Sequence, residues 1–139
     1  MNHFKDCKLV FGVAGATAAT TAVTTAIIDT ANFEGVAFFG RIATANAGNH
    51  VKVQQGDAAN MSDAADLAGT ETVTGDDADS FLVDVYRPTK RYVRATITRT
   101  ASTVTGDVYA VLYGPRKVPV THGDTIDAEY HQSPAEGTA

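Results

Sequence analysis

Short runs of alternating apolar and polar residues recur along the chain, about ten residues apart. In the run "RYVRATITRT", the apolar Val93, Ala95 and Ile97 alternate with polar and charged residues. A period of two places successive side chains on opposite faces of a β-strand, so one face of this strand is expected to be buried. Because no helical periodicity separates the runs, the sequence predicts an all-β fold, either a sandwich or a barrel.

The residue types also favour strands over helices. Alanine, threonine, glycine and valine dominate the chain, and long helix-forming charged residues are scarce. Two runs, at residues 35–45 and 108–114, are apolar on both faces, which indicates central strands. The run at 35–45 is predicted to form a hairpin with residues 50–55. The remaining predicted strands lie at residues 22–29, 70–74, 81–86 and 91–100.

These strands define a single predicted domain at residues 22–114. The Ala- and Thr-rich residues 1–21 are expected to form a flexible N-terminal arm. Residues 115–139 lose all periodicity and are expected to form an extended C-terminal tail that is ordered only where something holds it. The single Cys7 cannot form an internal disulfide, so the hydrophobic core must hold the fold together.

The charge balance of the chain opposes binding to a polyanion. Asp and Glu number 16 and Lys and Arg number 11, which gives a formal net charge of −5. We therefore expect no nucleic-acid partner. No stretch approaches the roughly 20 apolar residues of a membrane span, and the N-terminal sequence is a poor signal peptide. A soluble protein made in the cytoplasm, without a membrane partner, is expected.

Within this acidic chain, "RPTKRYVRATITRT" gathers basic residues around one predicted strand. Three hypotheses compete for them: a nucleic-acid surface, a docking surface for an acidic protein, and ordinary solvent-facing side chains. In that strand, alternation places the side chain of Arg99 on the inward face. Further along, "PRKVPV" suits an extended segment laid along a partner. The residues predicted to contact a protein partner are Arg87, Lys90, Arg91, Arg94, Arg116 and Lys117.

One loop offers a candidate metal site. The segment "TGDDADS" supplies Asp76, Asp77 and Asp79, and such carboxylates can coordinate Ca²⁺ through hard oxygen ligands. The loop lacks the full EF-hand pattern, and acidic turns before strands are common. The four histidines share no metal-ligand spacing, and they lie at His3, His50, His122 and His131.

Catalytic motifs are not recognisable in the sequence. No serine lies in a Gly-x-Ser-x-Gly pattern, and "GVAGAT" lacks the Gly-Lys-Ser/Thr ending of a phosphate-binding loop. Carboxylate pairs such as Asp63 and Asp66 are not singled out by their spacing. We therefore expect a protein that is not an enzyme and that uses no cofactor.

Residues 33–119 resemble a family of small β-sandwich proteins of tailed bacteriophages, which includes capsid cement and decoration proteins. The residues that carry the likeness are "FEGVAFFGRIATA", "VKVQQGDAANMSDAADLAG", "KRYVRATITRT" and "GDVYAVLYGPRKVPV", in this order. Each motif is short, and the order of the motifs is more specific than any one of them. The likeness covers roughly two-thirds of the chain.

The resemblance implies a single antiparallel β-sandwich of jelly-roll type and a structural role in the virion. Such a protein binds the outside of an HK97-type capsid, with the major capsid protein as its partner, and bridges neighbouring capsid subunits. It is made in the host cytoplasm and acts on the capsid surface. Copies placed on icosahedral symmetry are expected to form a homo-oligomer, with a trimer favoured over a dimer.

Two other functions remain open at this stage. A carbohydrate-binding module displayed on the virion would use calcium and exposed aromatic residues. The candidate aromatic residues are Tyr86, Tyr92, Tyr113 and Tyr130. A head-tail connector or tail subunit is the third possibility, because the fold alone does not separate these functions.

Overall fold

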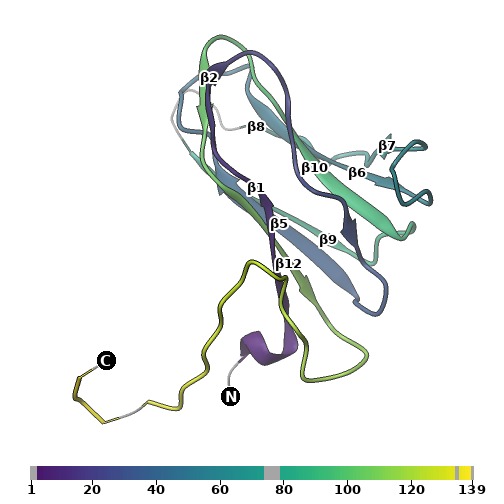
Figure 1. The fold of residues 1–139 in the computed structure, drawn as a ribbon. Coiled ribbons are helices and arrows are strands. Elements are labelled where there is room, and N and C mark those ends of the chain that lie inside the picture. Colours follow the sequence, from purple (N-terminus) through teal and green to yellow (C-terminus); the bar gives the residue numbers. More distant parts are fainter. Residues whose placement is uncertain (1–2, 74–78, 134, 139) are drawn as a thin grey trace.

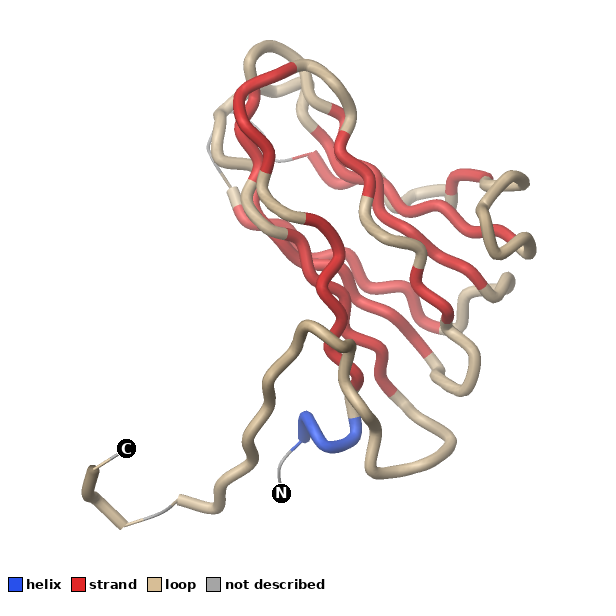
Figure 2. Tube along the Cα trace, viewed as in Figure 1, coloured by secondary structure: helices blue, strands red, loops and turns tan. Residues whose placement is uncertain are grey.

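The computed structural model of the chain describes residues 3–73, 79–133 and 135–138. Two antiparallel sheets pack against each other as two layers (Figures 1 and 2). The first sheet has the order β1-β12-β5-β9. Its strands are β1 (Lys8–Val13), β12 (Val108–Tyr113), β5 (Gly35–Arg41) and β9 (Ser80–Tyr86).

The second sheet is built around β10 (Tyr92–Thr98) and β6 (His50–Gly56), which pair along their whole length. On the outer side of β10 lie β3 (Val23–Thr24) and β4 (Ile28–Asp29). On the outer side of β6 lie β7 (Ala65–Asp66) and β8 (Thr72–Val73). Each edge of this sheet is therefore one strand interrupted in the middle.

The remaining elements lie outside the two sheets. Strand β2 (Ala16–Ala19) pairs with β11 (Thr103–Thr105), and a 3₁₀ helix η1 (His3–Asp6) precedes β1. No helix among the described residues is long and apolar enough to cross a membrane.

The strand order is that of a jelly roll. With each interrupted edge counted as one strand, the order β1-β12-β5-β9 faces the order β3/β4-β10-β6-β7/β8. Successive strands of the chain are thus divided between the two sheets in the pattern of two nested Greek keys. The predicted all-β sandwich of jelly-roll type is confirmed.

The core lies between the two sheets and follows the predicted alternation. On β10 the buried residues are Val93, Ala95 and Ile97, and on β5 they are Val36 and Phe38. The further buried members are Val23, Ile28, Ile42, Val51, Val53, Phe81, Val83, Val108, Ala110 and Leu112. Strands β5 and β12 are central in their sheet, as predicted. Their outward-facing apolar side chains, however, are only half-buried.

The predicted hairpin of residues 35–45 and 50–55 is wrong. Strand β5 pairs with β12 and β9, and β6 pairs with β10, so the connection between β5 and β6 crosses from one sheet to the other. Asn49, which is fully buried, lies in this connection and accepts a hydrogen bond from the Thr100 backbone N–H at 2.8 Å. Strand periodicity does not show whether a connection turns back or crosses over.

The strand predicted at residues 22–29 is interrupted. Between β3 and β4, the Thr25 side chain accepts a hydrogen bond from the Ala95 N–H at 3.0 Å. The Ala26 N–H donates to the Gly12 carbonyl of the opposite sheet at 2.9 Å. The backbone of this segment therefore leaves the regular ladder and connects the two layers.

The prediction that the sandwich begins at residue 22 is also wrong. Strand β1 pairs with β12 over its whole length and forms an edge of the first sheet. A register shift between Phe11 and Val13 allows both Val10 and Val13 to pack against the core. The short apolar run Lys8–Val13 thus forms an edge strand, and its bulge lets it follow β12.

Beyond β12 no described residue belongs to a strand or helix, and the first part of the tail lies along β1. The Val120 N–H donates to the Lys5 carbonyl at 3.1 Å, and the Gly123 N–H donates to the Leu9 carbonyl at 3.0 Å. The Leu9 N–H in turn donates to His122 Nδ1 at 2.9 Å. The N-terminal and C-terminal segments therefore hold each other, and Figure 1 shows the tail leaving the sandwich beyond them.

Arg99 is a buried arginine at the end of β10, and 6% of its surface is exposed. Its guanidinium donates to the backbone carbonyls of Thr21, Thr17 and Thr103 at 2.5, 2.7 and 2.9 Å. It also donates to the Thr21 hydroxyl at 2.8 Å. One side chain thus donates to carbonyl groups of β2, of β11 and of the segment that follows β2.

Replacing Arg99 with methionine should lower the free energy of unfolding by about 2–4 kcal/mol, because buried carbonyl groups lose their donors. The Arg94→Met variant is the matched control. Arg94 lies on the same strand, is partly exposed and donates one hydrogen bond to Gln54, so its loss should cost less than about 1 kcal/mol. Urea unfolding measures both values. Equal, small losses would show that water replaces the Arg99 guanidinium.

Candidate functional site

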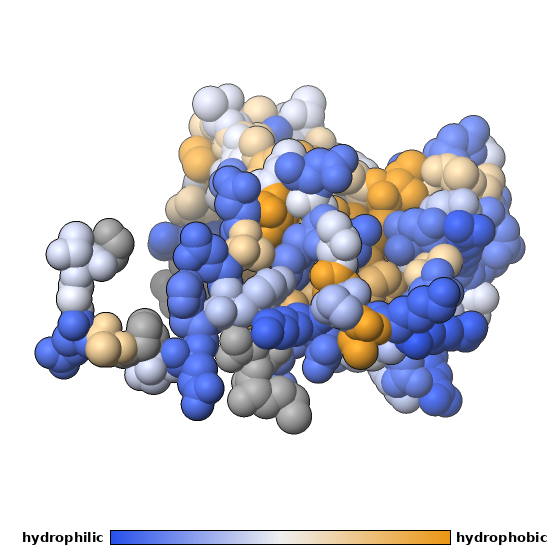
Figure 3. Space-filling view, turned by 60° about the horizontal axis from the view of Figure 1, so that its bottom comes forward, coloured by the Kyte–Doolittle hydropathy of each residue, from blue (hydrophilic) through white to orange (hydrophobic). Residues whose placement is uncertain are grey.

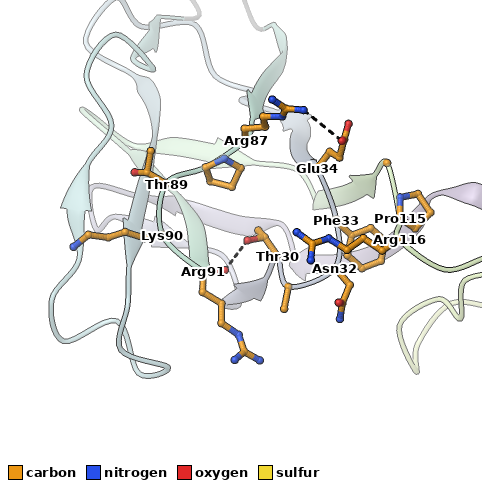
Figure 4. Close-up of a pocket in the computed structure, with 13 residues that line it drawn as sticks. Thr30, Asn32, Phe33, Glu34, Arg87, Thr89, Lys90, Arg91, Pro115 and Arg116 are labelled. Atoms are coloured by element: carbon orange, nitrogen blue, oxygen red, sulfur yellow. Dashed lines mark hydrogen bonds and ion pairs between the residues drawn. The ribbon is translucent and has the colours of Figure 1, made fainter.

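Three chain segments meet around a hollow at one end of the sandwich, with a volume of about 750 Å³. Residues 30–34 connect β4 to β5, residues 87–91 connect β9 to β10, and residues 114–116 follow β12. Its lining includes Arg87, Lys90, Arg91 and Arg116, and we call it the basic hollow (Figure 4). In the space-filling view of this end, hydrophilic residues surround several apolar groups (Figure 3).

Backbone hydrogen bonds fix the three segments to one another. The Thr30 N–H and hydroxyl both donate to the Arg91 carbonyl, at 3.0 and 2.7 Å. The Arg87 N–H donates to the Glu34 carbonyl at 2.7 Å. The Arg116 N–H donates to the Asn32 carbonyl at 2.9 Å. The basic hollow is therefore a preformed part of the fold.

Three residues of the hollow adopt a left-handed backbone conformation. Asn32, Arg87 and Gly114 have φ angles of 71°, 51° and 62°. Asparagine and glycine adopt this region readily, whereas it is unfavourable for arginine by roughly 1–2 kcal/mol. At Gly114 a Cβ atom would lie 2.8 Å from the Glu34 Cβ, so this position also needs a glycine for space. Such outliers gather at sites where the surrounding structure holds the chain in place.

Most cations of the basic hollow already have acidic partners within the chain. Arg91 donates two hydrogen bonds to the Asp29 carboxylate, at 2.9 and 2.8 Å. The Lys90 ammonium lies 3.5 Å from Asp57 and 3.7 Å from Asp63. In Figure 4 the side chains of Lys90 and Arg91 point away from the centre of the hollow. These two cations therefore contribute little net attraction for an acidic ligand.

Arg87 and Arg116 remain the most available cations. Arg87 lies 3.7 Å from Glu34, a loose ion pair, and its side chain is 69% exposed. Its guanidinium also lies over the Tyr86 ring at 5.1 Å. Arg116 is exposed and has no ion pair among the described residues. A carboxylate in the hollow would meet these two guanidinium groups first.

The structure brings together four of the six residues predicted to contact a partner. Arg94 lies instead on the outward face of the second sheet, where it donates to Gln54 Oε1 at 2.9 Å. Lys117 is exposed next to Arg116 and does not line the hollow. Arg116 and residues 87–91 are far apart in the sequence, so the sequence alone did not predict that they lie together.

The first sheet carries an apolar outward face that the sequence analysis missed. Side chains opposite one another in the register share a face, so Phe39 lies between Tyr109 and Leu82. The Phe39 and Tyr109 rings are stacked with their centroids 6.0 Å apart, and Phe11 meets Tyr109 edge to face at 5.3 Å. We call this surface the aromatic face. Its members are Leu9, Phe11, Ala37, Phe39, Leu82, Tyr86, Tyr109, Val111 and Tyr113.

The outward face of the second sheet is polar by contrast. Its side chains include Thr24, His50, Lys52, Gln54, Asp66, Arg94, Thr96 and Thr98. The Lys52 ammonium contacts the Asp66 carboxylate at 2.6 Å, and Gln54 donates to the same carboxylate at 2.7 Å. The two outer faces of the sandwich therefore differ in character, and the aromatic face is the one suited to a dry contact.

The aromatic residues proposed for carbohydrate binding do not form one group. Tyr86 and Tyr113 share the aromatic face. The Tyr113 hydroxyl donates to Asp84 at 2.6 Å, and burial together with this hydrogen bond raises the pKa of Tyr113. Tyr92 lies on the second sheet next to Arg91, and Tyr130 lies in the tail, where it contacts His122.

The candidate calcium ligands cannot be placed together. Asp76 and Asp77 lie outside the described residues, and Asp79 is exposed just before β9. The described residues contain no group of three or more His, Cys, Asp or Glu side chains able to hold a metal ion. The four histidines are dispersed: His131 contacts Glu129, His122 contacts Leu9, His50 contacts Gly48, and His3 lies in η1.

Comparison of the chain with protein-family models and with curated proteins finds no match.

The Asp29 and Arg91 pair should make stability depend on pH. The hydrogen bonds from Arg91 hold the pKa of Asp29 below its ordinary value. A carboxyl group with a lowered pKa stabilises the fold above its ordinary pKa, and this contribution is lost as the pH falls through the folded-state value. Unfolding free energies of the wild type and Arg91→Gln, measured from about pH 7 to about pH 2, should therefore converge at the acidic end. A difference that stays constant with pH would contradict this role of the pair.

Proposed function

We propose that this protein is a structural virion protein that binds the outside of an HK97-type phage capsid and bridges neighbouring capsid subunits. One observation carries the proposal: exposed cations from distant segments gather in a preformed hollow at one end of a small jelly-roll domain. The order of the motifs in residues 33–119, which resembles that of cement and decoration proteins, supports the same function.

The proposed partner is an acidic segment of the major capsid protein. A carboxylate in the basic hollow would accept paired hydrogen bonds from Arg116 or Arg87, and these charge-assisted bonds fix orientation as well as adding affinity. A protein that binds the assembled shell and not its separate subunits stabilises the assembly by mass action. Bridging therefore needs no chemistry beyond this binding.

The carbohydrate-binding alternative is supported by one observation. Tyr86 and Tyr113 lie on the aromatic face together with Phe39 and Tyr109, and sugars stack on such flat aromatic surfaces. The same face is also suited to a protein partner. Glycan binding is therefore treated below as an outcome of the experiment on that face.

Charge reversal at the basic hollow should weaken binding to the shell. Co-sedimentation of the purified protein with expanded empty phage capsids should show saturable binding that falls as salt is raised. The Arg116→Glu variant should bind roughly tenfold more weakly at low salt, because a favourable contact becomes a repulsive one. Arg116 is exposed, so the fold should be retained, which the unfolding midpoint checks.

Arg94→Glu is the matched control for this experiment. It makes the same charge reversal on the outward face of the second sheet and should leave binding unchanged. If Arg94→Glu weakens binding and Arg116→Glu does not, the docking surface is the β10 face. If the wild-type protein does not bind mature shells at low salt, the capsid function is excluded.

A further inference from the structure

We propose that the aromatic face binds a second copy of this chain, face to face, about a two-fold axis. The axis runs along the central row of the face, across the strands. Two features carry the inference: the apolar extent of the face and the positions of the two charges on it. The proposal does not depend on the capsid function.

The strand register divides the aromatic face into rows. The central row runs Phe11, Tyr109, Phe39, Leu82 across β1, β12, β5 and β9. On one side the next rows are Leu9, Val111, Ala37, Asp84 and then Tyr113, Gly35, Tyr86. On the other side lies the pair of Arg41 and Ser80.

The face is largely apolar and has no covering layer among the described strands. Leu82 and Tyr86 are 66% and 57% exposed, and the apolar side chains between them and β1 are half-buried. At the β1 edge, Leu9 also adjoins the C-terminal tail. Strands about 4.8 Å apart and rows about 6.8 Å apart give a footprint of roughly 400 Å². This is the size of the largest apolar patch on a typical monomer, and such patches are often functional.

The same footprint sets the expected affinity. Two copies together would bury somewhat more than roughly 800 Å², which is the size of a weak, transient interface. The stacked and edge-to-face rings of the central row are already held by one another, so little side-chain freedom is lost on binding. A reversible dimer with a dissociation constant of micromolar order is therefore expected.

The two charged side chains of the face select the two-fold arrangement. Among the strand residues on this face, Arg41 and Asp84 alone are charged, and they lie one row to either side of the central row. A rotation by half a turn about the central row exchanges the two flanking rows. It places β5 of one copy over β5 of the other. Arg41 of each copy then lies opposite the row that holds Asp84 of the other.

The sideways offset between these two groups is one strand spacing, about 4.8 Å, because β5 and β9 are neighbours. An arginine side chain can span this offset, so each dimer would contain two such ion pairs. The ion pair offsets part of the cost of removing both charged groups from water in the contact. The bond from the Tyr113 hydroxyl keeps Asp84 in place.

Sedimentation velocity of the full chain over about 1–100 μM should reveal a monomer–dimer equilibrium. The Leu82→Glu variant should weaken the dimer at least about tenfold, because Leu82 lies on the proposed axis and the two carboxylates would face each other. Val118→Glu is the matched control. Val118 is 62% exposed, lies in the tail outside the face, and should leave the dissociation constant unchanged when replaced.

A charge swap tests the two-fold geometry itself. Arg41→Glu and Asp84→Arg should each weaken the dimer, and the double variant should recover most of the loss because the ion pairs are restored with opposite sense. Unfolding midpoints check that each variant is folded. If Asp84→Arg does not fold, Arg41→Lys should retain the dimer while Arg41→Glu weakens it.

Three results would overturn the proposal. The wild-type chain could remain monomeric over the whole range, or it could form an oligomer that Leu82→Glu does not weaken. Alternatively, the monomeric chain could bind soluble glycans in a way that Leu82→Glu abolishes. That last result would assign the aromatic face to a carbohydrate ligand.

Discussion

A two-layer sandwich can bury only one face of each of its sheets, and the other features of this molecule follow from that limit. Strands β5 and β12 are apolar on both faces, yet their sheet has the second layer on one side only. The outward side chains therefore form the aromatic face, whereas the second sheet directs threonine, glutamine and charged groups outward. This difference between the layers gives the molecule a preferred side for contact.

Buried polar groups determine how the chain crosses between the layers. Asn49 accepts hydrogen bonds from Thr100 and Thr103, and Arg99 donates to carbonyl groups of β11 and of the segment after β2. These bonds lie at the end of the sandwich opposite the basic hollow, because they adjoin the start of β6 and the end of β10. One end is thus fixed by buried polar side chains, and the other end presents exposed loops.

The fold could be predicted from the sequence to the extent that it depends on local alternation. The buried set Val93, Ala95 and Ile97 follows from the period of two, and the central position of β12 follows from its apolar residues on both faces. Strand β1 could not be predicted, because its pairing depends on the edge that β12 offers. The basic hollow and the aromatic face depend on topology, which places Arg116 near Arg87 and leaves Phe39 without a covering layer.

The two surfaces adjoin each other, and this has a consequence for bridging. The last row of the aromatic face contains Tyr113, Gly35 and Tyr86, and the next residues along the three strands are Gly114, Glu34 and Arg87, which line the basic hollow. A two-fold axis across the strands reverses their direction, so the two hollows of a dimer would lie at opposite ends. If the hollow binds a capsid subunit as proposed, one dimer could hold two neighbouring subunits at once, and each weak contact would strengthen the other through effective concentration.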